Sequence, residues 1–171
     1  MLVEIQSLIA PAQPGTPRRA TIGWDSGRLA MVLAVLEARA GISFAGQDVY
    51  LNVAGGLRVA EPAADLAAAA ALISSLAGTA VPADTVVFGE IGLSGEVRPV
   101  AHAEARLKEA AKLGFKNALA PAPHRAGSAT ARHTGIAVRE IRHVADLVQL
   151  LARVTPRGVH SPNDKGRKAD A

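Results

Sequence analysis

The chain has 171 residues, a length that fits one compact domain, and 49% of them are hydrophobic, which is enough to bury a core. Only 3% are aromatic and none is cysteine, so the core is expected to be aliphatic, and disulfides, zinc–thiolate sites and cysteine nucleophiles are excluded. The formal net charge of +4, with a pI near 10.0, fits either an ordinary solvated surface or a face that binds polyanions.

The first half of the chain is predicted to contain strands and a capped helix. Alternation over 2–9 predicts a half-buried strand that begins at once, which is typical of a domain cut from a longer chain. The N-terminus has no basic region and no long apolar run, so neither a signal peptide nor a transmembrane helix is expected. The next elements are a strand over 18–23, a helix that Asp25 or Ser26 caps and Gly41 ends, and a strand over 47–56 with a short partner at 57–59.

An alanine-rich helix from Pro62 to about Ala77 opens the second half. Proline suits the first helical position, and Asp65 in the first turn is favoured by the helix dipole, so folding alone explains this entrance. The mixture of helices with short, partly hairpin-linked strands favours an α+β fold over a regular βαβ array. The remaining elements are a hairpin of 84–91 and 95–100, a helix over 101–114, short strands over 117–121 and 136–141, a helix over 143–154, and a flexible basic tail over 155–171 that includes Lys165, Arg167 and Lys168.

Several motifs that would carry chemistry are absent or have a simpler explanation. Ser26 lies in a segment similar to the nucleophile loop of chymotrypsin-like proteases, but here it opens a helix and is interpreted as a cap. No G-x-x-x-x-G-K-[ST] motif occurs, so Walker-type nucleotide hydrolysis is excluded for this chain. The five histidines are too scattered to predict a zinc site: His102, His124, His133, His143 and His160.

Three blocks of sequence resemble the C-terminal domain of the bacterial RadA (Sms) family of DNA-repair proteins. They are DVYLNVAGGLRVAEPAADLAAAAALISSL, VVFGEIGLSGEVRPV and ARLKEAAKLGFKNALAP, and the resemblance runs from Leu2 to Val154. That domain is similar to the proteolytic domain of Lon, so the resemblance implies a Lon-like domain over 1–154, with the ribosomal protein S5 domain 2-like fold of short mixed sheets and packed helices. The family's upstream zinc finger and RecA-like ATPase, which would hold zinc and ATP with magnesium, are absent from this chain, and no cofactor is expected in it.

The same resemblance implies a degenerate protease site. Lon proteases place their serine in a G-P-S-A-G segment at the start of the matching helix, where this chain has Ala63. Their catalytic lysine falls at Glu104. A Ser-Lys dyad needs a hydroxyl and a neutral amine, and neither residue supplies one. Lys108, one turn further on, is expected to pair with Glu104 on the helix surface. A Lon-type serine peptidase with a rearranged site is the alternative interpretation.

Without catalysis, the resemblance implies a scaffold that helps to assemble a hexameric ring and binds double-stranded or branched DNA during recombinational repair in the bacterial cytoplasm. Phosphate contacts would give sequence-independent binding, and no base stacking is expected. A RecA-type recombinase is a further partner that this family suggests, and no membrane is expected. The alternative is a structural cap of the ATPase ring that never touches DNA. The candidate DNA-binding residues are Arg18, Arg19, Arg98, Arg106, Lys108 and Lys112.

Overall fold

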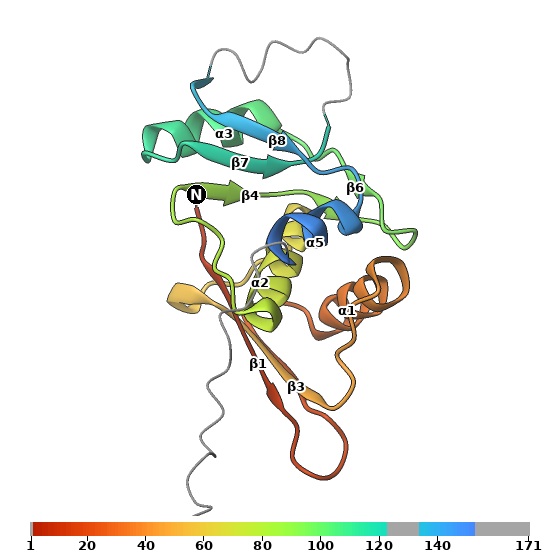
Figure 1. Cartoon of the computed structure of the whole chain (residues 1–171). Helices are drawn as coiled ribbons and strands as arrows, with labels where there is room; N and C mark the ends of the chain where they lie inside the picture. Colours follow the sequence, from red (N-terminus) through yellow and green to blue (C-terminus); the bar gives the residue numbers. More distant parts are fainter. Residues whose placement is uncertain (1, 123–133, 153–171) are drawn as a thin grey trace, which may run out of the picture.

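The computed structural model describes residues 2–122 and 134–152 of the chain (Figure 1). The predicted tail over 155–171, with Lys165, Arg167 and Lys168, lies outside the described residues. So do His124, His133 and His160, together with most of the loop that precedes the last strand. The rest forms an α+β arrangement of three small sheets and four helices among the described residues, which confirms the predicted fold class at this level.

The first sheet, here called sheet A, has three strands in the order β1-β3-β2. β1 (Ile5–Pro11) runs antiparallel to β3 (Gln47–Val53), and β2 (Arg19–Ile22) runs parallel to it on the other side. Between β2 and β3 lies α1 (Ser26–Ala40), whose first turn is capped by Asp25: the Oδ1 atom accepts the Arg28 N–H at 2.7 Å. Gly41 ends this helix in the left-handed conformation, as predicted.

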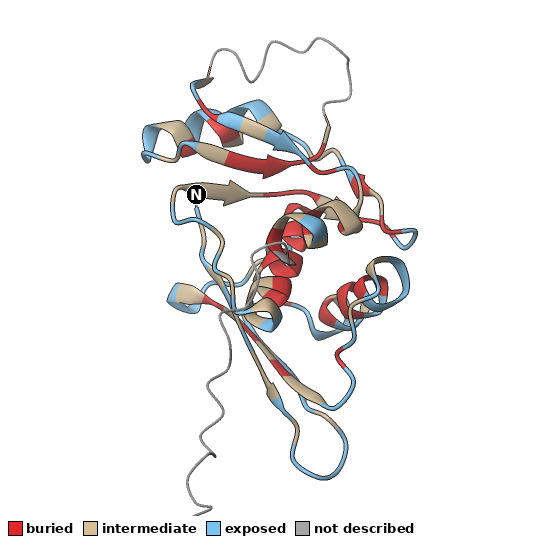
Figure 2. Cartoon of the chain, in the orientation of Figure 1, coloured by how far each residue is buried: buried red, intermediate tan, exposed pale blue. Residues whose placement is uncertain are grey.

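The alanine-rich segment begins as predicted at Pro62 but changes its geometry after one turn. A short 3₁₀ turn, η2 (Pro62–Ala64), leads into α2 (Asp65–Ala77), which ends at Gly78 in the left-handed conformation. Small alanine side chains let α2 lie close to β1 and to the last helix, α5 (Val144–Ala152). Helices α1, α2 and α5 share one aliphatic core with the inner face of sheet A, shown by the buried residues in Figure 2.

The second sheet, here called sheet B, has the order β4-β7-β8 and is parallel throughout. α3 (Ala103–Lys112) connects β4 (Thr85–Val87) to β7 (Asn117–Ala120) and covers the outer face of the sheet (Figure 1), while β8 (Ala137–Glu140) forms its edge. A second small core that includes Phe88 and Leu107 lies between α3 and the sheet. The chain therefore contains one local βαβ unit within the predicted α+β fold.

Two predicted strands differ from the structure. The segment 84–91 is divided: β4 joins sheet B, and only β5 (Glu90–Ile91) forms the predicted hairpin with β6 (Val97–Arg98). The segment 57–59 is not a strand, although the Val59 N–H donates to the Gly23 carbonyl at 2.9 Å. Gly23 has φ of +76°, and any side chain there would strike the Val53 side chain and the passing backbone of Leu57, so this crossing needs glycine. After β3, the predicted Gly-Gly turn forms η1 (Ala54–Gly56).

Helices in the described part of the chain were also compared with the dimensions of a lipid bilayer. None of them is both long enough and apolar enough to cross a membrane.

Candidate functional site

The start of α2 is closed rather than open to a substrate. Ala63, at the position matched to the serine of Lon, is only 3% exposed. Its carbonyl accepts the Gly89 N–H at 2.8 Å, and the Leu66 N–H donates to the Gly89 carbonyl at 3.0 Å. A Cβ atom on Gly89 would lie 2.8 Å from the Val97 side chain, so the segment after β4 fits tightly over the helix entrance. A side chain at position 63 is therefore covered by the protein's own backbone.

A buried ion pair lies beside this entrance. Asp65 is fully buried, and its carboxylate receives two bonds from the Arg28 guanidinium: Nε to Oδ1 at 2.5 Å and Nη2 to Oδ2 at 2.7 Å. Oδ2 also accepts the Ile91 N–H at 3.1 Å, which attaches β5 to the same group. The hydrogen bond to the Asp65 carboxylate raises the pKa of Arg28 above its usual value, so its charge is permanent. This pair joins α1, α2 and β5.

Glu104, at the position matched to the lysine of Lon, lies in the first turn of α3. Its carboxylate pairs with the Lys108 ammonium at 2.7 Å, and both side chains are 55% exposed, which confirms the predicted surface pair. One turn away, Arg106 contacts Glu61 at 3.2 Å. Since Glu61 directly precedes η2, this pair holds the start of α3 beside the start of α2. The two degenerate positions thus lie on neighbouring segments that contain neither a hydroxyl nucleophile nor a free amine base at those positions.

Four of the predicted DNA-binding residues are held by acidic neighbours. Arg106 and Lys108 pair with glutamates as described above, and the Lys112 Nζ atom lies 3.8 Å from a Glu109 oxygen. On β6, Arg98 pairs with Glu96 and lies 3.7 Å from Glu90. The pKa of Glu96 falls to about 2, chiefly because the Ser94 hydroxyl donates a hydrogen bond to it. Exposed ion pairs contribute little to stability, so a phosphate can replace the carboxylate in these contacts.

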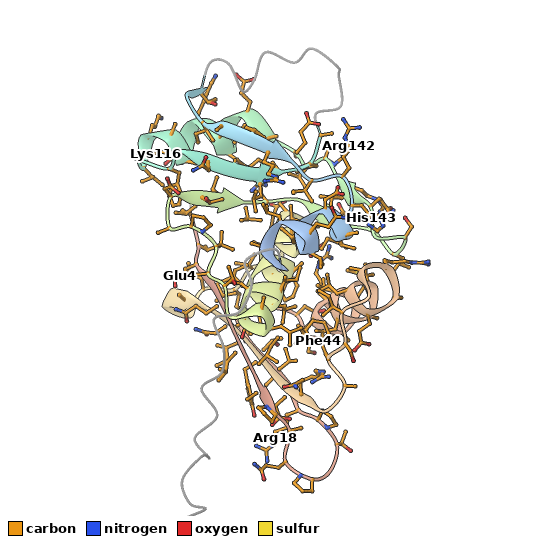
Figure 3. All side chains as sticks on the ribbon, viewed as in Figure 1. Glu4, Arg18, Phe44, Lys116, Arg142 and His143 are labelled. Atoms are coloured by element: carbon orange, nitrogen blue, oxygen red, sulfur yellow. The ribbon has the colours of Figure 1, made fainter. Side chains whose placement is uncertain are left out.

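The other two predicted residues lie elsewhere. Arg18 is at the far end of sheet A from α3, near the bottom of Figure 3. The neighbouring Arg19 guanidinium donates to the carbonyl oxygens of Gln47, Phe44 at 3.0 Å and Arg18 at 3.2 Å, so it closes the loop before β3. Within residues 2–122 and 134–152, the Arg18 side chain has no ion pair. The structure therefore groups Arg106, Lys108 and Lys112 on α3 and separates them from Arg18 and Arg19.

Sequence reasoning missed Arg28. Its partner Asp65 is 37 positions away, and no local spacing points to the pair. Only the aspartate at a helix start carried a signal, and the helix dipole was a sufficient explanation for it. Across the described residues, no three histidine, aspartate or glutamate side chains gather as a group that could hold a metal ion.

Comparison with known families defines the class first. The sequence profile of the family described as "Subunit ChlI of Mg-chelatase" matches residues 26–124, more than half of the 171 residues, and the chain belongs to this family. The matched region begins with α1 and includes the closed entrance of α2 and all of α3.

The chain is also homologous to proteins named DNA repair protein RadA. It is 66% identical over 121 residues to that of Brucella abortus, a match that covers 71% of this chain and 26% of the relative. It is 50% identical over 146 residues to that of Pseudomonas aeruginosa, with 85% and 32% covered, and 47% identical over 151 residues to that of Aquifex aeolicus, with 88% and 33% covered. The chain thus spans about a quarter to a third of the length of these curated relatives.

Proposed function

We propose that this chain is a non-catalytic, Lon-like domain of a RadA-type DNA-repair ATPase that helps to assemble a hexameric ring and binds DNA without sequence preference. The relatives named DNA repair protein RadA support a role in DNA repair. The observation that carries the non-catalytic part is the closed entrance of α2, where Ala63 is 3% exposed and has no hydroxyl. The ATPase activity belongs to the longer protein in this proposal, and this chain supplies a scaffold.

The DNA-binding part rests on the cations of α3. Lys108 and Lys112 are separated by four residues, so they project from one side of the helix, and their side chains are 55% and 76% exposed. Such residues bind phosphates as point charges and carry no information about base sequence. Binding would then release counterions and weaken as salt increases. In the cell, we propose that this takes place in the bacterial cytoplasm, with a RecA-type recombinase as a further partner.

A titration of labelled double-stranded DNA with the chain tests this proposal. Fluorescence anisotropy at about 50 mM and 200 mM salt should show binding that weakens by at least tenfold between the two conditions, since the contacts are with phosphates. A titration without any change in anisotropy at the lower salt would instead favour the structural cap, which assembles the ring and never contacts DNA.

The peptidase alternative has its own test. Installing the missing dyad with Ala63→Ser and Glu104→Lys is expected to produce no cleavage of a fluorogenic peptide, because position 63 is covered by the Gly89 segment. A serine-reactive phosphonate should leave the mass of both the wild-type chain and the double variant unchanged. Covalent labelling of any serine in the wild-type chain would contradict the non-catalytic assignment.

A further inference from the structure

One face of sheet A is uncovered among the described residues. Strand side chains alternate between two faces, and in β3 Val49 and Leu51 are buried against the helices. The opposite face carries Leu8 and Ile22, which are 60% and 64% exposed. Figure 2 shows the contrast between the buried helices and the partly exposed strands β1 and β3. Large aliphatic side chains this exposed, on neighbouring strands, are typical of a surface that another molecule covers.

The uncovered face has an apolar centre and a polar border. A hollow of about 330 Å³ lies on it, and Leu8, Tyr50 and Ile22 are among the residues that line it. Leu8 lies opposite Tyr50 in the sheet register. Beside them, the Asn52 Nδ2 group donates to Gln6 Oε1 at 3.2 Å, so the border is made of side-chain amides. An apolar centre with a polar, uncharged border fits a protein surface better than a phosphate backbone.

Charges of opposite sign mark the two ends of this face. Glu4 lies at one end of β1, with its carboxylate accepting the Gln6 amide at 2.9 Å, and Arg18 lies at the other end of the sheet (Figure 3). In the described part of the chain, neither takes part in an ion pair. Asp48 shares the Arg18 end and accepts the Arg18 N–H at 2.7 Å. With Arg19 included, the Arg18 end has a net positive charge.

We propose that a second copy of this chain packs on this face, sheet against sheet, around a two-fold axis that crosses the strands. Two identical faces can be stacked around an axis along the strands or across them. The axis along the strands places Glu4 against Glu4 of the second copy, so like charges meet. The axis across the strands places each Glu4 against the Arg18 end of the other copy, while the two apolar centres coincide. Charge complementarity therefore selects the second arrangement.

This dimer contact goes beyond the proposed ring. A ring joins each copy to its neighbours through two different patches, whereas a two-fold contact joins the same patch of both copies. Three strands of up to seven residues give a face of about 24 Å by 14 Å. That is smaller than the interface of a permanent dimer. The contact is therefore weak and depends on protein concentration.

Sedimentation velocity over a wide range of chain concentrations tests the contact. Leu8→Asn is expected to raise the dimer dissociation constant at least tenfold, and Leu93→Asn is the matched control, since Leu93 is 70% exposed on the turn between β5 and β6. Glu4→Lys and Arg18→Glu should each weaken association by a similar factor, and the double variant should restore it. Circular dichroism should show unchanged melting, because these side chains are exposed.

Each other outcome overturns the proposal. A wild-type chain that stays monomeric at every concentration would exclude the dimer, and loss of DNA binding in a monomeric Leu8→Asn variant would assign the face to DNA instead. Association that Leu93→Asn weakens and Leu8→Asn leaves intact would place the contact on the other side of the molecule. A hexamer that all these variants leave unchanged would support the ring and reject the two-fold contact, so the two ideas fail separately.

Discussion

Replacing Asp65 with alanine is expected to lower the free energy of unfolding by about 3–5 kcal/mol, because the change leaves the Arg28 guanidinium without its buried partner. The Ile91 N–H also loses its acceptor, which adds a buried donor without a bond. Urea denaturation followed by circular dichroism measures the difference. A loss this large is a substantial part of the stability of a typical domain.

Two further variants separate the ion pair from a general effect of mutation. Arg28→Met keeps the aliphatic stem and leaves Asp65 charged and unpaired, so it should also be strongly destabilising. Glu104→Ala removes one partner of an exposed pair on α3 and should change stability by less than about 1 kcal/mol. If Asp65→Ala proves no more destabilising than Glu104→Ala, the buried pair does not hold the helix entrance together.

This pair also shows why the α2 entrance could be read only partly from sequence. Pro62, the alanine run and Gly78 are local signals, and they predicted a helix whose bounds the structure confirms. What closes the entrance comes from distant positions: Arg28 precedes it by many residues, and Gly89 follows it from another sheet segment. Local periodicity has no access to such contacts, because they arise only when separate elements pack together.

The sheets show the same division between local and distant information. The strand patterns of β1 and β3 were recognisable from alternation, and the parallel position of β2 beside β3 was not, since α1 separates the two strands in sequence. The segment 84–91 looked like one strand because its side chains are uniformly suited to strands. In the structure, Gly89 bonds to the start of α2, and this contact divides the segment between two sheets.

For the basic residues, sequence supplied the candidates and the structure supplied their grouping. Arginine and lysine are recognisable one at a time, and their positions on surfaces depend on the fold. Arg106, Lys108 and Lys112 share α3, whereas Arg18 and Arg19 lie at the far end of sheet A (Figure 3). A short DNA contact made by α3 alone would leave the Arg18 end free for the second copy of the chain. The two surfaces can then be tested with independent variants.

Neutralising the α3 cations is expected to weaken DNA binding more than neutralising Arg18. In Lys108→Gln with Lys112→Gln, two exposed ammonium groups are lost, and the salt slope of log K should become shallower by about 1.8, since each phosphate contact contributes about 0.9. Affinity at about 50 mM salt should fall roughly tenfold, by the same counterion argument. Glutamine keeps the helical propensity and avoids placing new carboxylates beside Glu104 and Glu109.

The control for this measurement is Arg142→Gln, which removes an exposed cation that pairs with Glu140 and belongs to neither group of candidates. It lowers the net charge without touching α3, so a slope as reduced as that of the lysine variants would mean that overall charge alone drives binding. A reduced slope in Arg18→Gln, with the lysine variants unchanged, would move the DNA path to the end of sheet A. Because Arg18 also belongs to the proposed dimer face, DNA and the second copy would then compete for the same surface.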